Sequence, residues 1–200
     1  MDFTDQRTEL KQIYDAYEKE VALFKIGAIC KPGCSFCCTH FGNVDITTLE
    51  GRIIHEWVHR QRPEHRAVLR RKLKKNQKAK EKGAAAPCPF LKSDHTCEIY
   101  PIRPFSCRQL YSVRQCDSRG PTLHRQSREA AQRAIARLQQ LDTNGYSGHI
   151  SYILNLLDQK RFCNVYFKNG FDPSTIQAFG KKHGIVVNQK APVKSKARKP

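Results

Sequence analysis

The sequence contains no run of about 18 apolar residues, and its first seven residues, MDFTDQR, hold no apolar segment of the kind that directs secretion. We therefore expect neither a membrane-spanning helix nor a secreted protein. We expect the chain to reside in the reducing cytoplasm. Its nine cysteines are an odd number in a chain of 200 residues, which is not typical of a small disulfide scaffold.

Acidic residues are scarce, since 18 Asp and Glu oppose 36 Lys and Arg and leave a net charge of +18. Residues 51–82 carry +9 of this charge, residues 181–200 carry +7 and contain no acid, and the other 148 residues carry only +2. Few aromatic residues interleave the basic run, so base stacking is not supported. The sequence predicts one basic helix and one basic tail, and nucleic acid is not the favoured partner.

Helical periodicity covers most of the chain outside one central segment. Apolar residues at three- and four-residue spacing predict a helix from about Thr4 to Ile26. The sequence Thr47-Thr48-Leu49-Glu50 is a capping-box pattern, so a second helix should begin there. Further helices are expected over about 64–82, 122–141 and 150–157, and after Asp172-Pro173, where Asp172 would be the N-cap.

Periodicity fails between Gly83 and Gly120, where four prolines forbid long helices and four cysteines occur. Such a segment needs an organiser other than apolar burial. We predict a mainly α fold, a small helical domain with Cys-rich and Pro-rich metal-binding loops. The domain should span residues 1–185, with a basic disordered tail at 186–200.

The cysteines form two sets along the chain. The first set, C-x3-C-x2-C-C, places four thiols within nine residues, and the second set is spread over a longer segment. Soft thiolates at close spacing suit zinc or an iron-sulfur cluster. The candidate metal ligands are Cys30, Cys34, Cys37, Cys38, Cys88, Cys97, Cys107 and Cys116.

The spacing of these cysteines slightly favours iron-sulfur over zinc. Zinc sites usually present paired C-x2-C motifs, and only Cys34 and Cys37 form such a pair. The adjacent Cys37 and Cys38 project differently, so one of them is left for a second metal, a bridging role or redox chemistry. Eight thiols are compatible with one site or with two.

These motifs make the sequence resemble the YkgJ-type cysteine-cluster family, which is described as a zinc- or iron-chelating domain. The resemblance covers residues 27–116 and rests on CKPGCSFCC at 30–38, TTLE at 47–50, CPFL at 88–91 and CEIYPIRPFSCR at 97–108. It implies metal binding by the seven cysteines within those motifs. Cys116 is added as an eighth candidate, and Cys163 is expected to be a core thiol.

The function predicted in this way is that of a cytoplasmic metal-chelating protein in which two groups of cysteines converge, with a redox role and an unidentified redox or protein partner. Arg103 and Arg108 stand beside cysteines, and we consider them as cofactor-binding residues because they could offset thiolate charge or hold an anion. Whether the protein is an enzyme is left open.

Two alternatives accompany this prediction. The family is similar to flagellin lysine methylases, which implies an S-adenosylmethionine-dependent protein lysine methylase-like enzyme, although the sequence shows no G-x-G-x-x-G loop for that cofactor. The other alternative is a zinc-scaffolded nucleic-acid or protein adaptor built on the basic residues of 66–82 and 190–199.

A further motif, H-E-x-x-H at residues 55–59, is typical of zinc peptidases. At about 100° per residue, His55 and His59 fall on the same helix face as Arg52 and Arg62, which we expect to be exposed, cationic and unfavourable for Zn²⁺. We therefore do not predict a peptidase.

Overall fold

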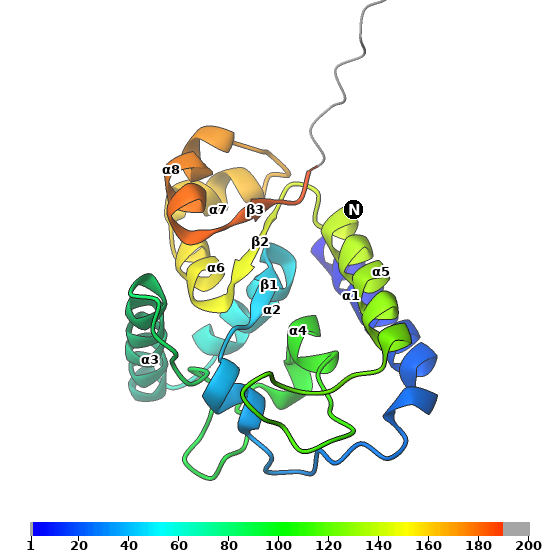
Figure 1. The fold of residues 1–200 in the computed structure, drawn as a ribbon. Coiled ribbons are helices and arrows are strands. Elements are labelled where there is room, and N and C mark those ends of the chain that lie inside the picture. The colour runs from blue at the N-terminus through cyan, green and yellow to red at the C-terminus, as the bar shows by residue number, and fades with distance from the viewer. Residues whose placement is uncertain (1, 190–200) are drawn as a thin grey trace, which may run out of the picture.

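The computed structural model describes residues 2–189, apart from the side chain of Phe41, and its fold is mainly α, as predicted (Figure 1). Three short strands and three short non-α helical turns accompany the α-helices. The α-helices are α1 (Phe3–Val21), α2 (Thr48–His59), α3 (Pro63–Glu81), α4 (Phe105–Arg108), α5 (Arg125–Leu141), α6 (Ile150–Leu157), α7 (Lys160–Tyr166) and α8 (Pro173–His183). The other elements are β1 (Asp45–Thr47), β2 (Tyr146–His149), β3 (Val186–Val187), η1 (Leu23–Lys25), η2 (Cys37–Phe41) and η3 (Tyr100–Ile102).

The helix boundaries follow the local sequence signals. The predicted capping box is present, because the Glu50 amide donates to Thr47 Oγ1 at 3.2 Å and the Thr47 amide donates to Glu50 Oε2 at 2.8 Å. Asp172 is the N-cap of α8, as predicted, and accepts from the Ser174 amide. The expected N-terminal helix is shorter than predicted, because α1 ends at Val21 and η1 follows.

Two hydrophobic clusters organise these helices. The smaller cluster lies where α1 packs beside α5, and the larger one joins the sheet to α2, α3, α6, α7 and α8 (Figure 1). The helices α2 and α6 approach closely at Gly51, where an added Cβ would lie only 2.6 Å from Ile153 Cγ2. The helix α2 lies between the two clusters, with one face toward each, and links the two halves of the core.

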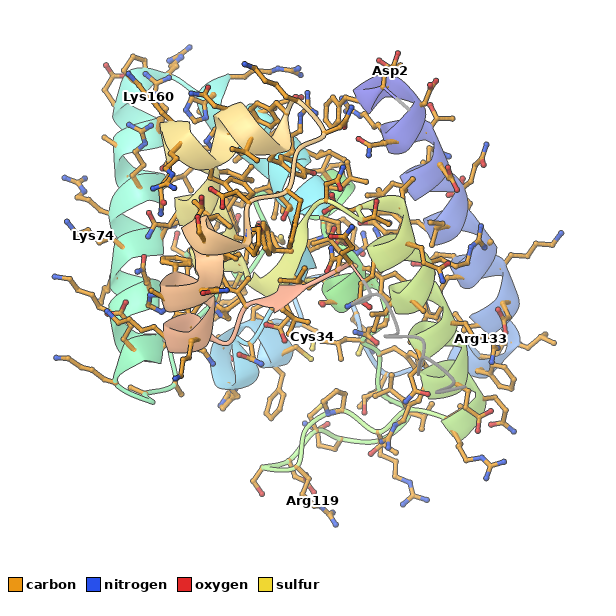
Figure 2. All side chains as sticks on the ribbon, turned by 90° about the horizontal axis from the view of Figure 1, so that it is seen from above. Asp2, Cys34, Lys74, Arg119, Arg133 and Lys160 are labelled. Atoms are coloured by element: carbon orange, nitrogen blue, oxygen red, sulfur yellow. The ribbon has the colours of Figure 1, made fainter. Side chains whose placement is uncertain are left out.

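The helix α3 is the basic helix that the sequence predicted. It buries only Leu69 and Asn76, and it forms the edge of the molecule opposite α1 and α5 (Figure 1). The cationic side chain of Lys74 points away from the body of the protein (Figure 2).

A small antiparallel sheet, with strand order β1-β2-β3, was not predicted. Its strands have only two to four residues, too few for a period-two pattern to be recognised. Val186 and Val187 pair with Ser147 and Tyr146, so the predicted start of a disordered tail at residue 186 is wrong. Those two residues gain backbone hydrogen bonds from β2 that their local composition does not reveal. The rest of the predicted tail, residues 190–200, lies outside the described residues.

One buried carboxylate ties three helical segments together. Asp142 follows α5 and is only 1% exposed. It accepts from the Leu49 amide at the start of α2 and from the Tyr166 hydroxyl of α7, both at 2.8 Å. Burial, the largest influence, raises the pKa of Asp142 to about 7 despite these hydrogen bonds.

This raised pKa predicts a pH-dependent stability. Because the pKa in the folded state exceeds the unfolded value of about 3.9, the folded state binds more protons between pH 4 and 7. The contribution of Asp142 to the free energy of unfolding should therefore fall as pH rises through that window, by at most about 1.4 kcal/mol per pH unit. We expect urea titrations to show this slope for the wild type relative to Asp142→Asn. A difference between the two proteins that does not change with pH would contradict the prediction.

Candidate metal centre

Two loop regions that are distant in sequence meet at one end of the molecule. The segment that follows α1 and the segments on either side of α4 run together below the helices (Figure 1). Backbone hydrogen bonds join them, since Cys88 donates to the carbonyl of Cys38 at 2.7 Å and Ile29 donates to that of Ser112 at 2.8 Å. Cys34 lies on the first of these loops (Figure 2).

Four cysteines on the outer side of this region form what we call the outer cysteine group: Cys30, Cys34, Cys37 and Cys116. Burial, supplemented by the charges of the other three members and of Cys38, raises the pKa of Cys37 to about 12. Burial also raises the pKa of Cys30, which is acted on by Cys34 and Cys116. Cys30 and Cys34 are exposed, so this group borders solvent.

The other four cysteines form the inner cysteine group: Cys38, Cys88, Cys97 and Cys107. Burial raises the pKa of Cys88 to about 12 and that of Cys107 well above its usual value, and the charges of Cys38 and Cys97 act on both. Burial also raises the pKa of Cys97. The backbone amides of Phe90 and Ile99 hydrogen-bond to the thiols of Cys88 and Cys97, respectively, and partly oppose the rise in their pKa values. The inner group is thus more enclosed than the outer group.

The adjacent Cys37 and Cys38 contribute to different groups. Both lie on η2, a π-helical turn, and different thiols act on them most strongly, Cys116 on Cys37 and Cys97 on Cys38. Cys34 of the outer group also acts on Cys38, so the two groups are neighbours. Pi-helical turns are rare and are frequently found at functional sites.

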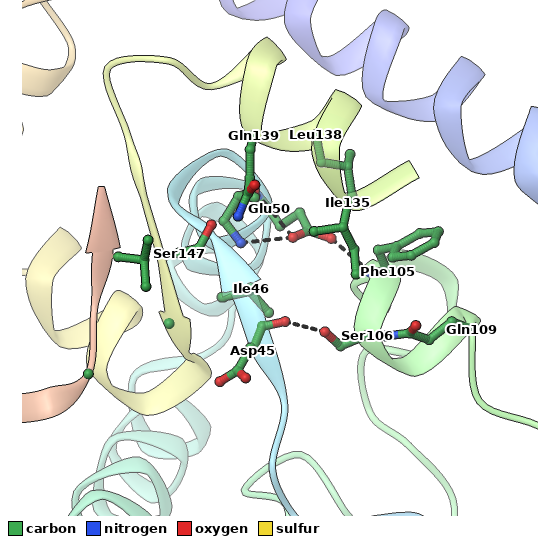
Figure 3. Close-up of a pocket in the computed structure, with 14 residues that line it drawn as sticks. Asp45, Ile46, Glu50, Phe105, Ser106, Gln109, Ile135, Leu138, Gln139 and Ser147 are labelled. Carbon is green, nitrogen blue, oxygen red and sulfur yellow. Dashed lines mark hydrogen bonds between the residues drawn. The ribbon is translucent and has the colours of Figure 1, made fainter. Parts of the chain in front are cut away.

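The inner group is held in place by Glu50, which the sequence identified only as a capping residue. Glu50 is 4% exposed. Its Oε1 accepts from the amide of Phe105 at 2.7 Å and from the hydroxyl of Tyr14 at 2.6 Å. Ser106 Oγ also donates to the carbonyl of Asp45 in β1 (Figure 3). These bonds fix α4, and with it Cys107, against the start of α2.

A cleft of about 340 Å³ opens beside α4 (Figure 3). It lies between the sheet, α4 and α5, and is lined by Asp45, Ser106, Gln109 and Gln139 among others. Ser106 directly precedes Cys107, so the cleft adjoins the helix that carries an inner-group thiol.

The two arginines proposed to bind a cofactor have different surroundings. The charge of Arg103 lowers the pKa of Cys97, against the larger effect of burial. Its guanidinium lies over the ring of Tyr100, 4.0 Å from the centroid. Arg108 instead donates to the carbonyls of Arg103 and Pro101 at 2.9 and 3.2 Å. Arg103 is therefore near a thiol, Arg108 braces the loop, and a cofactor contact by either stays a prediction.

Cys163 behaves as the core thiol that the sequence predicted. It lies on α7, is partly buried against the larger hydrophobic cluster, and donates from Sγ to the carbonyl of Leu157 at 2.8 Å. It belongs to neither cysteine group, which makes it a control position.

Comparison with known proteins supports a metal-chelating role. Residues 29–119 match the family model CxxCxxCC, described as a putative zinc- or iron-chelating domain. The match confirms the resemblance seen in the sequence, and the matched range contains all eight cysteines of the two groups. No curated protein and no solved structure gives a significant match. Within residues 2–189, no helix has both the length and the apolar character needed to cross a bilayer.

The geometry predicts an order of thiol reactivity in metal-free protein. Cys34 is exposed, whereas Cys88 and Cys107 are enclosed and have raised pKa values that disfavour the reactive thiolate. After chelator treatment, iodoacetamide should modify Cys34 first and Cys88 and Cys107 last, with peptide mass spectrometry as the readout. Equal rates at all nine cysteines would contradict the arrangement of the two groups.

Proposed function

Because residues 29–119 match the model of a zinc- or iron-chelating family, we propose that this domain binds two iron-sulfur clusters, one in each cysteine group, and has a redox role in the cytoplasm. The observation that carries the proposal is the different surroundings of the adjacent Cys37 and Cys38, since the charge of Cys116 acts most strongly on Cys37 and that of Cys97 on Cys38. Four thiolates are the usual ligand set of such a cluster.

A zinc ion and an iron-sulfur cluster require different spacings of the sulfur atoms. In tetrahedral zinc thiolates, Zn–S bonds of about 2.3 Å place the sulfurs about 3.8 Å apart. Within residues 2–189, no set of three cysteine sulfurs lies within 4.8 Å of one another. A cubane cluster separates its thiolates more widely, because each one binds a different iron.

The surroundings of the inner group suit bound thiolates. The charge of Lys72 acts to lower the pKa of Cys88, and that of Arg103 acts to lower the pKa of Cys97, although burial has the larger effect. Amide hydrogen bonds to both sulfurs act in the same lowering direction. Without metal, the enclosed thiols keep their protons, so metal binding would release them and gain from the preformed cationic and amide groups.

The exposure of the outer group suggests which of the two groups exchanges electrons with a partner. Iron-sulfur clusters held by thiolates exchange single electrons at potentials set by hydrogen bonding and solvent exposure. The buried Cys88 and the partly buried Cys107 would limit the access of water to the inner group, whereas the exposed Cys30 and Cys34 leave the outer group accessible. We place the docking site of the unidentified redox partner at the outer group.

The test is the metal content of protein purified without oxygen. We expect broad visible absorbance and matching iron and sulfide. Cys34→Ser and Cys107→Ser should each remove about half of the iron, because each breaks one group, and Cys163→Ser should remove none.

Two results would overturn the proposal. A colourless protein that holds zinc and no sulfide would make the cysteines a scaffold and favour the adaptor alternative. Loss of all iron in both Cys34→Ser and Cys107→Ser, with the helical circular dichroism unchanged, would mean a single shared site.

The cleft beside α4 supports a second candidate, an S-adenosylmethionine-dependent protein lysine methylase-like enzyme. Its volume of about 340 Å³ is within the range of small-molecule pockets, and it adjoins Cys107 through Ser106. Calorimetric titration with S-adenosylmethionine tests it. Binding that is lost in Ser106→Phe, a change that fills the cleft, supports this candidate, and absence of binding to the wild type removes it.

A further inference from the structure

Three side chains that belong to neither cysteine group come together beside α2. His55 and His59 are one turn apart on α2, and Asp158 directly follows α6 as its C-cap. One nitrogen of each imidazole and one carboxylate oxygen all lie within 4.8 Å of one another. Within the described residues, no other set of three or more His, Cys, Asp or Glu ligand atoms is so compact.

One hydrogen bond of this cluster, at His59, resembles those around metal ligands, and another joins two of the candidate ligands to each other. His55 Nε2 lies 2.9 Å from Asp158 Oδ1. His59 Nδ1 lies 2.9 Å from the carbonyl of His55, which can only accept, so Nδ1 carries the proton and Nε2 has the free lone pair. Metal-binding imidazoles commonly donate their other ring N–H to a backbone carbonyl in this way.

The charges around the cluster are of both signs, since Asp158 and Glu56 supply carboxylates and Arg70 adds a cation that acts on Asp158. The sequence placed both histidines on an arginine-rich, exposed face and offered no acid besides Glu56. In the structure, Asp158 brings a carboxylate from another helix. Glu56 lies 3.8 Å from Arg52 and 3.7 Å from Arg60, so it offsets two of the neighbouring cations.

We propose that His55, His59 and Asp158 bind one divalent transition-metal ion, with Zn²⁺ the best match, at a site separate from both cysteine groups. Two imidazoles and one carboxylate are a ligand set that zinc uses, with a fourth position open to water. Bonds of about 2.0–2.2 Å in tetrahedral geometry place neighbouring ligand atoms about 3.3 Å apart. The His55–Asp158 pair would therefore open by a few tenths of an ångström to admit the ion.

The close approach of α2 and α6 supports this site. The absence of a side chain at Gly51 lets the two helices pack at Ile153, and Asp158 follows at the end of α6. The packing of α6 on α2 thus places the backbone of Asp158 beside α2. A rigid scaffold lowers the ordering cost of binding.

The test is a Zn²⁺ titration of the full chain with its cysteine groups loaded, followed by equilibrium dialysis and metal analysis. We expect one additional equivalent for the wild type and for His124→Ala, an exposed histidine on another element. In His59→Ala and Asp158→Asn, binding of this equivalent should weaken at least about tenfold. Visible absorbance and circular dichroism serve as controls that the cysteine groups and the fold are intact.

Cobalt substitution provides an independent readout. Co²⁺ bound by two imidazoles and a carboxylate should give no sulfur-to-cobalt charge-transfer band, because no thiolate takes part. The proposal is overturned if the wild type binds no additional Zn²⁺, if His59→Ala and Asp158→Asn bind it as tightly as the wild type does, or if the cobalt form shows that band.

Discussion

The start of α2 is the junction on which the described structure depends. A helix N-terminus exposes amides that need acceptors, and here the acceptors come from distant parts of the chain. Asp142 accepts from the Leu49 amide, and Thr48 exchanges two hydrogen bonds with the backbone of Tyr146 in β2. Glu50 completes the local cap and also accepts from α4 and α1. One helical turn thus fixes the sheet, both hydrophobic clusters and the inner cysteine group relative to one another.

This arrangement has an electrostatic cost that the fold offsets with hydrogen bonds. Glu50 and Asp142 are both buried, and the charge of Glu50 adds to the effect of burial in raising the pKa of Asp142. Backbone amides and tyrosine hydroxyls satisfy their oxygens, as buried carboxylates require. The polar junction therefore specifies one geometry, because a displaced helix would leave a carboxylate without donors.

Sequence reasoning was reliable where the signal is local. The capping box at Thr47, the N-cap at Asp172 and the periodic helices depend on residues a few positions apart, and the structure confirms them. The strands escaped detection because their partners are distant in sequence and each strand is very short. For the same reason the carboxylate of Asp158 could not be assigned to the histidines on α2, since only the packing of α2 on α6 brings them together.

The cysteines also show that sequence spacing predicts local features better than contacts between distant segments. Spacing identified eight candidate ligands and predicted that Cys37 and Cys38 would diverge. It could not assign Cys116 to the outer group or Cys107 to the inner group, because the path of the chain from Gly83 to Gly120 follows no periodic pattern. That path is set by the contacts of α4 with Glu50 and by backbone bonds such as the one from Cys88 to Cys38.

The division of the thiols also has a consequence for biosynthesis. Each group takes members from both loop regions, so neither is complete on a growing chain until Cys107 or Cys116 has been made. The thiols of residues 30–38 would therefore lack their partner cysteines while α3 is being synthesised. If the two groups bind metal as proposed, neither site can be filled completely before the chain that follows α3 has been made.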